Sequence, residues 1–238
     1  LKFSETATRF PTKATCLAIY SRVVNAQADL DEVLKSVFPW CAMWPAELRT
    51  LFGAYVEAKQ AQNVLDYDDL LLYWAGMMAE PAIASHVSSL FDHILVDEYQ
   101  DTNRLQSSVL LAMRPDGRGM TVVGDDAQSI YSFRAATVRN ILDFPGSFTP
   151  AADIVTVDRN YRSTQPILAA ANGVIARNPG RQDKKLWSAE GDGEQLVGYV
   201  GDDERDEAQF VADEIDRLSD EGIASPRDVA VFYRTNAQ

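Results

Sequence analysis

The sequence predicts an α/β fold, with parallel sheets flanked by helices and an all-helical portion at the N-terminus. Three short apolar runs, at 94–96, 120–123 and 154–157, are rich in β-branched residues, and each is followed at once by polar residues. This pattern is typical of buried parallel strands that end in loops. Segments with helical spacing follow the runs, which indicates that strands and helices alternate.

Residues 1–65 are expected to be helical, because they lack strand alternation. Apolar residues recur three and four positions apart at 30–37 and at 48–55, which places them on one face of a helix. Two pairs, Pro39-Trp40 and Trp44-Pro45, separate these stretches. We expect both tryptophans to lie in the core rather than to contact a ligand, since large aromatic side chains contribute most when they are buried.

The rest of the chain predicts further alternation of elements. The expected order is a helix at 67–78, the strands at 94–96, 120–123 and 154–157, a helix from about 165 to 177, a strand at 195–200, a helix at 204–219 and a strand at 229–233. Apolar residues on one face of the last helix are expected to pack on the sheet: Ala208, Val211, Ala212, Ile215 and Leu218.

Two carboxylates, Asp97 and Glu98, follow the first strand. Ligands of open α/β sheets bind outside the carboxyl ends of parallel strands, where such a pair can hold magnesium and activate a water beside a triphosphate. We interpret the pair as a Walker B element, in which Asp97 binds magnesium through water and Glu98 orients or deprotonates the attacking water. The alternative is that the pair caps the following helix or faces solvent.

Polar residues also follow the second and third strands. Gln128 carries both a donor and an acceptor, which suits it to sensing a terminal phosphate without neutralising the charge. Arg162 is a candidate arginine finger. If a second lobe carries its guanidinium to the nucleotide, the N–H donors of the guanidinium can bind γ-phosphate oxygens. The alternative for Arg162 is a surface ion pair, which is worth little energetically.

Tyr131, Phe133 and Arg134 lie just beyond Gln128. Aromatic faces stack on any base, and a neighbouring guanidinium adds a phosphate or cation-π contact. These residues are therefore candidates to bind single-stranded nucleic acid, with packing in a core as the alternative.

The motifs together resemble those of one known family. In order and spacing, 97–103, 124–134 and 160–163 look like motifs II, III and IV of the UvrD/Rep family of superfamily 1 DNA helicases. The stretches 65–71 and 233–238 are also similar to that family. The combination is specific even though each single motif is not.

The resemblance implies a helicase that uses ATP and Mg²⁺ to move 3′ to 5′ on single-stranded DNA and to open duplex at junctions, with repair or replication proteins as possible partners. It implies that Tyr161 stacks on adenine and that Arg234 and Asn236 contact the DNA backbone. The family usually has glycine where Ala135 stands, and a methyl group there could perturb a close backbone approach or a turn with positive φ.

The resemblance also implies the domain organisation, which is that of RecA-like P-loop NTPase lobes. Residues 1–65 would be a portion of the helical, 1B-like subdomain. Residues 66–152 would be part of the first RecA-like (1A-like) motor lobe, and residues 153–238 the start of the second (2A-like) lobe.

No Gly-x-x-x-x-Gly-Lys-Ser/Thr stretch occurs in the sequence, so no such loop cradles the α and β phosphates. We therefore expect this chain to be a piece of a longer helicase and to be inactive alone. One alternative is a helicase-nuclease subunit, or a degenerate helicase-like module that binds nucleic acid or protein without turnover. Another is a stand-alone metal-dependent hydrolase that uses Asp97, Glu98, Asp125 and Asp126.

The net charge of -13 argues against a general nucleic-acid binder, because neutralising phosphates requires a basic surface. Much of the acid lies at 190–221, where Asp202 to Glu207 would begin a helix and face solvent. Any contact with DNA should therefore be local, weak and sensitive to salt.

Composition predicts a cytoplasmic globular chain. With 238 residues and 46% hydrophobic content there is material for one or two cores, and neither a membrane-spanning run nor a signal segment is evident. Cys16 and Cys41 lack metal-ligand spacing, and His86 and His93 alone do not complete a zinc site. We expect both thiols to be reduced and buried.

Overall fold

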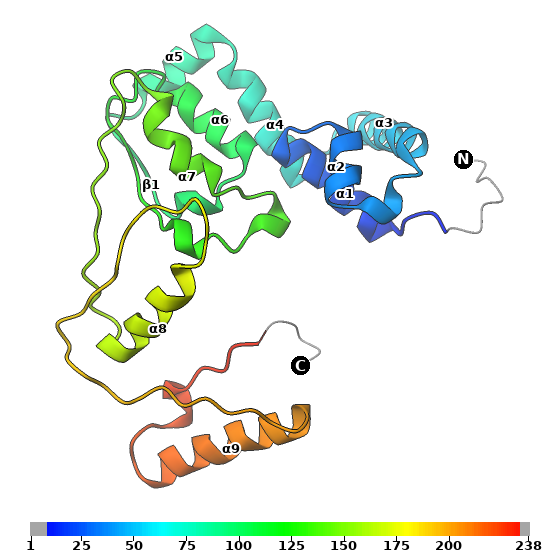
Figure 1. Ribbon diagram of the computed structural model, residues 1–238. Coiled ribbons are helices and arrows are strands. Elements are labelled where there is room, and N and C mark those ends of the chain that lie inside the picture. The colour runs from blue at the N-terminus through cyan, green and yellow to red at the C-terminus, as the bar shows by residue number, and fades with distance from the viewer. Residues whose placement is uncertain (1–8, 234–238) are drawn as a thin grey trace. The chain divides into compact units, whose positions relative to one another are not determined.

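The computed structural model describes residues 9–233, and the chain divides into two units (Figure 1). The first unit comprises Leu1–Val157 and Ile175–Lys185, and the second comprises Asp158–Val174 and Leu186–Gln238. Residues 175–185 thus belong to the first unit, although the chain on both sides of them belongs to the second.

The N-terminal part of the first unit is helical, as predicted. Its elements are α1 (Lys13–Ala26), α2 (Leu30–Ser36), a 3-10 turn (Pro39–Cys41) and α3 (Pro45–Gln62). The side chains of Thr12 and Asp29 accept hydrogen bonds from backbone N–H groups at the starts of α1 and α2, and Pro45 stands in the first turn of α3. The elements pack around one core: Cys16, Ile19, Leu30, Leu34, Cys41, Trp44 and Leu48.

The two tryptophans of this part differ. Trp44 is 4% exposed and meets Phe10 edge-on, with ring centroids 5.4 Å apart, so its predicted place in the core is confirmed. The prediction for Trp40 is wrong: it is 65% exposed, because the 3-10 turn directs Cys41 into the core and leaves Trp40 outside. Cys16 and Cys41 are free and buried, as expected, and burial raises the pKa of both thiols.

The rest of the first unit forms a small α/β layer (Figure 1). Its elements are α4 (Tyr67–Met78), α5 (Pro81–Ser89), β1 (Ile94–Val96), α6 (Arg104–Met113), β2 (Met120–Val122) and α7 (Arg139–Asp143). β1 and β2 are parallel, with Ile94 opposite Met120 and Val96 opposite Val122. α6 packs against α4 and α5 around a core of Met78, Val109 and Met113. The helix predicted at 67–78 and the first two predicted strands are confirmed, but the strands are not buried as predicted: no residue of β1 or β2 is buried, and Leu95 is 77% exposed.

Both long helices of this layer begin with reciprocal side-chain caps. At α4, Asp66 accepts from the backbone of Asp69 and Asp69 accepts from the backbone of Asp66. At α6, Asn103 and Gln106 form the same arrangement. Such capping boxes satisfy two N–H groups that the helix leaves unpaired, so these four residues define where the helices start.

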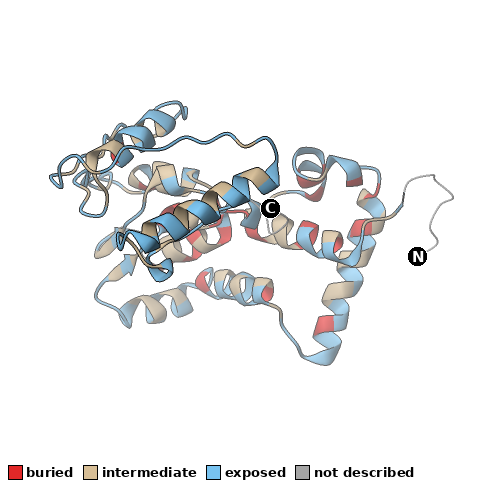
Figure 2. Ribbon diagram, turned by 90° about the horizontal axis from the view of Figure 1, so that it is seen from below, coloured by how far each residue is buried: buried red, intermediate tan, exposed pale blue. Residues whose placement is uncertain are grey.

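The second unit contains α8 (Gln165–Ile175) except for its last residue, and all of α9 (Glu204–Asp220), which confirms the helices predicted there. Asp203 caps α9 through the N–H groups of Arg205 and Asp206, in agreement with the predicted acidic helix start. Figure 2 shows that buried residues gather in the helices of the first unit, whereas no residue of α9 is buried. Within the described residues, no helix combines the length and the apolar character needed to cross a bilayer.

Three predicted strands are wrong. Within the described part of the chain, the segments 154–157, 195–200 and 229–233 are not paired as strands, and Val200, for example, is 94% exposed. A strand exists only where a neighbouring chain satisfies its N–H and C=O groups. The nearest approach to a sheet is an isolated parallel bridge between Arg159 and Trp187, so α9 has no sheet on which to pack.

Candidate functional site

The parallel pairing brings the loops after β1 and β2 together. The N–H of Val123 donates to the carbonyl of Val96 at 2.7 Å, and the N–H of Tyr99 donates to the carbonyl of Val123 at 3.0 Å. The ladder therefore continues past the end of β2 into the residues that follow β1. As a result, the two polar loops predicted from the sequence lie side by side in the first unit.

Asp97 and Glu98 are exposed at this edge. Asp97 accepts from the N–H of Glu98 at 2.9 Å, and Glu98 has a positive φ of 50°. Residues other than glycine rarely adopt this conformation, and it costs about 1–3 kcal/mol where it is retained at functional sites. No side chain caps the 3-10 turn that follows, and Asn103 caps α6, so the carboxylate pair is not used for helix capping.

Gln100 connects the two loops. Its side chain, on a residue that is 1% exposed, donates from Nε2 to Oε2 of Glu98 at 2.7 Å and accepts at Oε1 from the N–H of Asp125 at 3.0 Å. A Cβ on Gly124 would lie only 2.4 Å from Oε1 of Gln100. Glycine at 124 is therefore what allows the second loop to approach Gln100 this closely.

Gln128 is held by Asp125. Its Nε2 donates to Oδ2 of Asp125 at 2.9 Å, while Oδ1 of Asp125 accepts from the N–H of Ala127 and forms an ion pair with Lys184. Burial acts to raise the pKa of the Asp125 carboxyl, but hydrogen bonds from Lys184 and Gln128 outweigh it and hold the pKa below its usual value. Asp126 accepts from the N–H of Gln182 at 2.9 Å.

Tyr131, Phe133 and Arg134 form an exposed cluster. The two ring centroids are 5.7 Å apart, and the Arg134 guanidinium lies 5.5 Å from the Tyr131 centroid and 5.6 Å from that of Phe133. Phe133 is 72% exposed, so these side chains do not pack in a core. The next residue, Ala135, is buried with φ of 65°, the conformation for which glycine is usually used.

Tyr161 and Arg162 belong to the second unit, and both are exposed. The carboxamide oxygen of Asn160 accepts from the N–H groups of Arg162 and Ser163 at 2.9 and 2.7 Å, which shapes the loop. Arg159 stacks over Tyr161, 4.8 Å from the ring centroid. Among the described residues the exposed Arg162 guanidinium has no ion-pair partner.

The structure thus joins Glu98 to the Asp125 and Gln128 loop and places the aromatic cluster on the same unit. Arg234 and Asn236 lie outside the described residues. Sequence reasoning missed Gln100 and Lys184, since nothing in the local pattern distinguishes a buried amide or a lysine that reaches across the fold.

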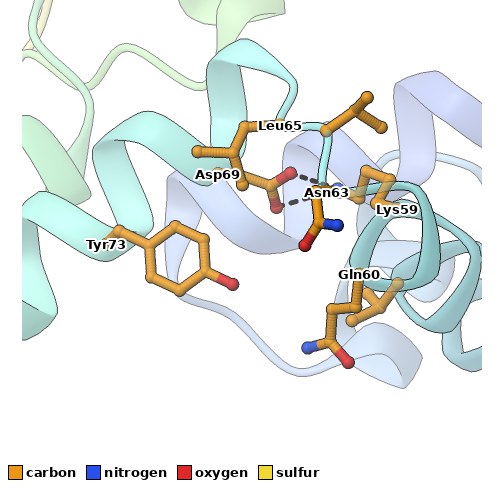
Figure 3. Close-up of a pocket in the computed structure, with 8 residues that line it drawn as sticks. Lys59, Gln60, Asn63, Leu65, Asp69 and Tyr73 are labelled. Carbon is orange, nitrogen blue, oxygen red and sulfur yellow. Dashed lines mark hydrogen bonds and ion pairs between the residues drawn. The ribbon is translucent and has the colours of Figure 1, made fainter.

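A pocket of about 370 Å³ lies elsewhere in the first unit, between α3 and α4 (Figure 3). It is lined by Val56, Lys59, Gln60, Asn63, Val64, Leu65, Asp69 and Tyr73. At its wall, Nζ of the buried Lys59 bonds to Asp66 at 2.7 Å, to Asp69 at 2.8 Å and to the hydroxyl of Tyr20 at 3.4 Å. Burial acts to lower the pKa of Lys59, but these bonds raise it above its usual value. The lysine and both carboxylates therefore already have partners, which indicates a structural cluster.

Comparisons with known proteins agree with the motifs. Residues 8–149 match the UvrD/REP helicase N-terminal domain, and residues 155–238 match the UvrD-like helicase C-terminal domain.

Several curated relatives are similar over most of this chain. ATP-dependent DNA helicase UvrD1 of Mycobacterium leprae is 44% identical over 228 residues, which cover 91% of this chain and 28% of that protein. UvrD1 of Mycobacterium tuberculosis is 48% identical over 195 residues, covering 79% of this chain and 25% of that protein. DNA helicase II of Escherichia coli is 41% identical over 192 residues, covering 79% and 26%. The chain spans about a quarter of the length of these relatives.

Proposed function

The chain belongs to the UvrD/Rep helicase family, and from that premise we propose that it forms part of an ATP-driven motor that moves 3′ to 5′ on single-stranded DNA and opens duplex at junctions. One observation carries the proposal. Through Gln100, Glu98 at the end of β1 is joined to the turn that leads to Gln128 after β2. This edge of a parallel sheet is where α/β proteins bind nucleotides.

The residues at this edge fit a magnesium nucleotide. Asp97 and Glu98 offer exposed carboxylate oxygens, the hard donors that Mg²⁺ prefers, and Asp97 would hold the ion through water. Bound Mg²⁺ would neutralise charge on the phosphate oxygens of ATP. Glu98, whose Oε2 is held by Gln100, keeps Oε1 to orient the attacking water and accept its proton. Gln128 contacts the terminal phosphate without neutralising it.

We assign the remaining roles by family position together with exposure. Arg162, which has no ion-pair partner among the described residues, stabilises charge that develops on the γ-phosphate, and Tyr161 stacks on adenine. Tyr131, Phe133 and Arg134 bind single-stranded DNA through stacking and a cationic contact. By the same family positions, Arg234 and Asn236 contact the DNA backbone.

We propose the organisation implied by the motifs: a 1B-like portion at 1–65, part of the first motor lobe at 66–152 and the start of the second at 153–238. The whole activity then requires residues beyond this chain, since its sequence has no phosphate-binding loop and it spans about a quarter of its relatives. The 238-residue chain alone is therefore expected to be inactive towards ATP.

The arrangement of side chains at the site does not support the alternative in which this chain is a stand-alone metal-dependent hydrolase. Asp125 is paired with Lys184, and Asp126 accepts from Gln182. Among the described residues no three His, Cys, Asp or Glu side chains are grouped to hold a metal ion. Magnesium-dependent cleavage of DNA by this chain without ATP would reverse that conclusion.

The test of the proposed function is ATP turnover by the full-length protein that contains this chain, with and without single-stranded DNA. Glu98→Gln and Arg162→Ala should each lower DNA-stimulated kcat by about 100-fold with nucleotide binding retained, because each removes an interaction made in the transition state.

Two substitutions at exposed positions serve as matched controls. Glu57→Gln on α3 and Arg205→Ala on α9 make the same chemical changes at exposed residues to which no role in the site is assigned, and should leave kcat unchanged. Turnover by Glu98→Gln within a few-fold of the unsubstituted protein would disprove the assigned role of the carboxylate.

A further inference from the structure

Residues 175–185 form a segment, here called the strap, that returns to the first unit. The chain immediately before it, at Val174, and immediately after it, at Leu186, belongs to the second unit. Within the strap, Arg181 donates to the carbonyls of Gln182 and Lys184. The strap presents two groups to the loop after β2.

Both groups contact acidic residues of that loop. The N–H of Gln182 donates to Oδ2 of Asp126 at 2.9 Å, and Nζ of Lys184 bonds to Oδ1 of Asp125 and lies 3.7 Å from Oδ1 of Asp126. The side chains of Lys184, Asp125 and Asp126 are 16, 20 and 6% exposed. Salt screens such partly buried ion pairs less than it screens surface pairs. Removing one partner leaves the other charge uncompensated, which is destabilising.

The Lys184 pair acts directly beside Gln128. One oxygen of Asp125 meets Lys184, and the other accepts from Nε2 of Gln128 at 2.9 Å. Lys184 is half-buried, and its ion pair fixes one oxygen of the Asp125 carboxylate, so the other oxygen points in one direction. The amide of Gln128 donates to that second oxygen and is therefore oriented indirectly by Lys184. The buried Gln100 holds the backbone of Asp125 from the opposite side.

We propose that Lys184 is a positioning residue for Gln128, acting through Asp125, and that the orientation of the Gln128 amide depends on the strap being seated on the loop after β2. The inference rests on the proposed role of Gln128 in ATP hydrolysis. Because the chain on both sides of the strap belongs to the second unit, displacement of the strap would change the orientation of Gln128 through the ion pair between Lys184 and Asp125.

The first experiment measures ATP turnover by the full-length protein. Lys184→Met should lower DNA-stimulated kcat about tenfold, with KM for ATP changed less than about threefold, because an interaction that orients a transition-state contact is lost. Lys184→Arg, which can still bond to Asp125, should restore most of the rate. Lys185→Met changes the neighbouring exposed lysine of the strap and should behave as the unsubstituted protein.

A double substitution distinguishes this inference from a structural role. In a Gln128→Ala background, Lys184→Met should cause no further loss, since its effect passes through the residue already removed. A full additional tenfold loss, or unchanged turnover by Lys184→Met alone, would overturn the inference. Unchanged turnover by Gln128→Ala would instead show that the proposed function has misplaced Gln128.

The second experiment measures hydrogen exchange in the full-length protein and does not depend on activity. Lys184→Met should speed hydrogen exchange at the N–H groups of Gln182 and Ala127 about tenfold, because both donate to the carboxylates that Lys184 holds. Lys185→Met should leave both rates unchanged. Equal exchange in the Lys184→Met and Lys185→Met variants would show that the strap is seated without the ion pair.

Discussion

In the first unit, the apolar runs at 94–96 and 120–122 pair with each other, whereas in the second unit the runs at 195–200 and 229–233 remain unpaired within the described residues. Both sets have the composition of strands. The paired runs are fixed by contacts beyond their own sequence: Ile94 packs against a core that includes Val109 and Met113 of α6, and Gln100 joins the loops that follow the strands. Composition therefore marks a segment that is able to pair, but pairing requires a neighbour that the segment does not itself specify.

The same contrast holds for charged clusters. In the first unit, Lys59 is buried between Asp66 and Asp69. In the second, Arg217 is paired with Glu214 and Glu221 along the exposed surface of α9. Removing one member of a buried cluster leaves an uncompensated charge, whereas a surface pair exchanges its partner for water. The two clusters therefore allow the packing of the two units to be compared by matched substitutions.

The largest expected effect is on the buried cluster. Lys59→Met should lower the free energy of unfolding by about 3 kcal/mol, since Asp66 and Asp69 lose their common cation. The matched Arg217→Met should cause no measurable change. Urea denaturation followed by circular dichroism checks both, and equal losses in the two variants would contradict the contrast between the units.

The buried cluster also predicts how stability depends on pH. Burial acts to raise the pKa of Asp66, but hydrogen bonds from Lys59 and from the backbone of Asp69 lower it below its ordinary value. A carboxyl with a lowered pKa stabilises the fold above its unfolded pKa of about 3.9, and this stabilisation is lost as the pH falls through the folded value. The difference between the unsubstituted protein and Lys59→Met should therefore shrink below about pH 4.

A smaller change in the free energy of unfolding is expected when a glycine in either unit is replaced by alanine. Gly124→Ala should destabilise the first unit by about 2 kcal/mol, because the new Cβ would meet Gln100 Oε1 at 2.4 Å and Ile141 Cδ1 at 2.7 Å. Gly198→Ala, in the unpaired run 195–200, meets nothing within 4 Å and should be neutral. The urea midpoints of the two variants test this, and a neutral Gly124→Ala would show that the loop after β2 is not packed against Gln100.

These substitutions also show how far the sequence could be read. The helices at 67–78 and 204–219 are predictable because their signals are local, and the structure shows that the side chains of Asp66 and Asp203 cap them. Gln100 and Lys184 could not be found, since their partner Asp125 is 25 and 59 positions away. Trp40 was misplaced for a related reason: a single 3-10 turn decides which side of the chain faces the core. The sequence does predict that the loops after the two strands lie together, because the ends of parallel strands meet at one edge of a sheet, and the roles of Asp97, Glu98 and Gln128 there stay predictions.

The smallest change in the free energy of unfolding is expected when either of two residues with positive φ is substituted. Ala135 in the first unit has φ of 65° and is buried, whereas Gly191 in the second has φ of 75°, and a Cβ added to it would meet nothing within 4 Å. Gly191→Ala should cost about 1 kcal/mol, since only the left-handed conformation is penalised. Ala135→Gly relieves a similar strain but gives up a buried methyl group worth about 0.8 kcal/mol and adds backbone freedom to the unfolded chain. These contributions nearly cancel, so stability should change by less than about 1 kcal/mol. A larger gain, measured by urea denaturation, would mean that the alanine strains the turn beside Tyr131, Phe133 and Arg134, and that the packing of its methyl does not compensate for the strain.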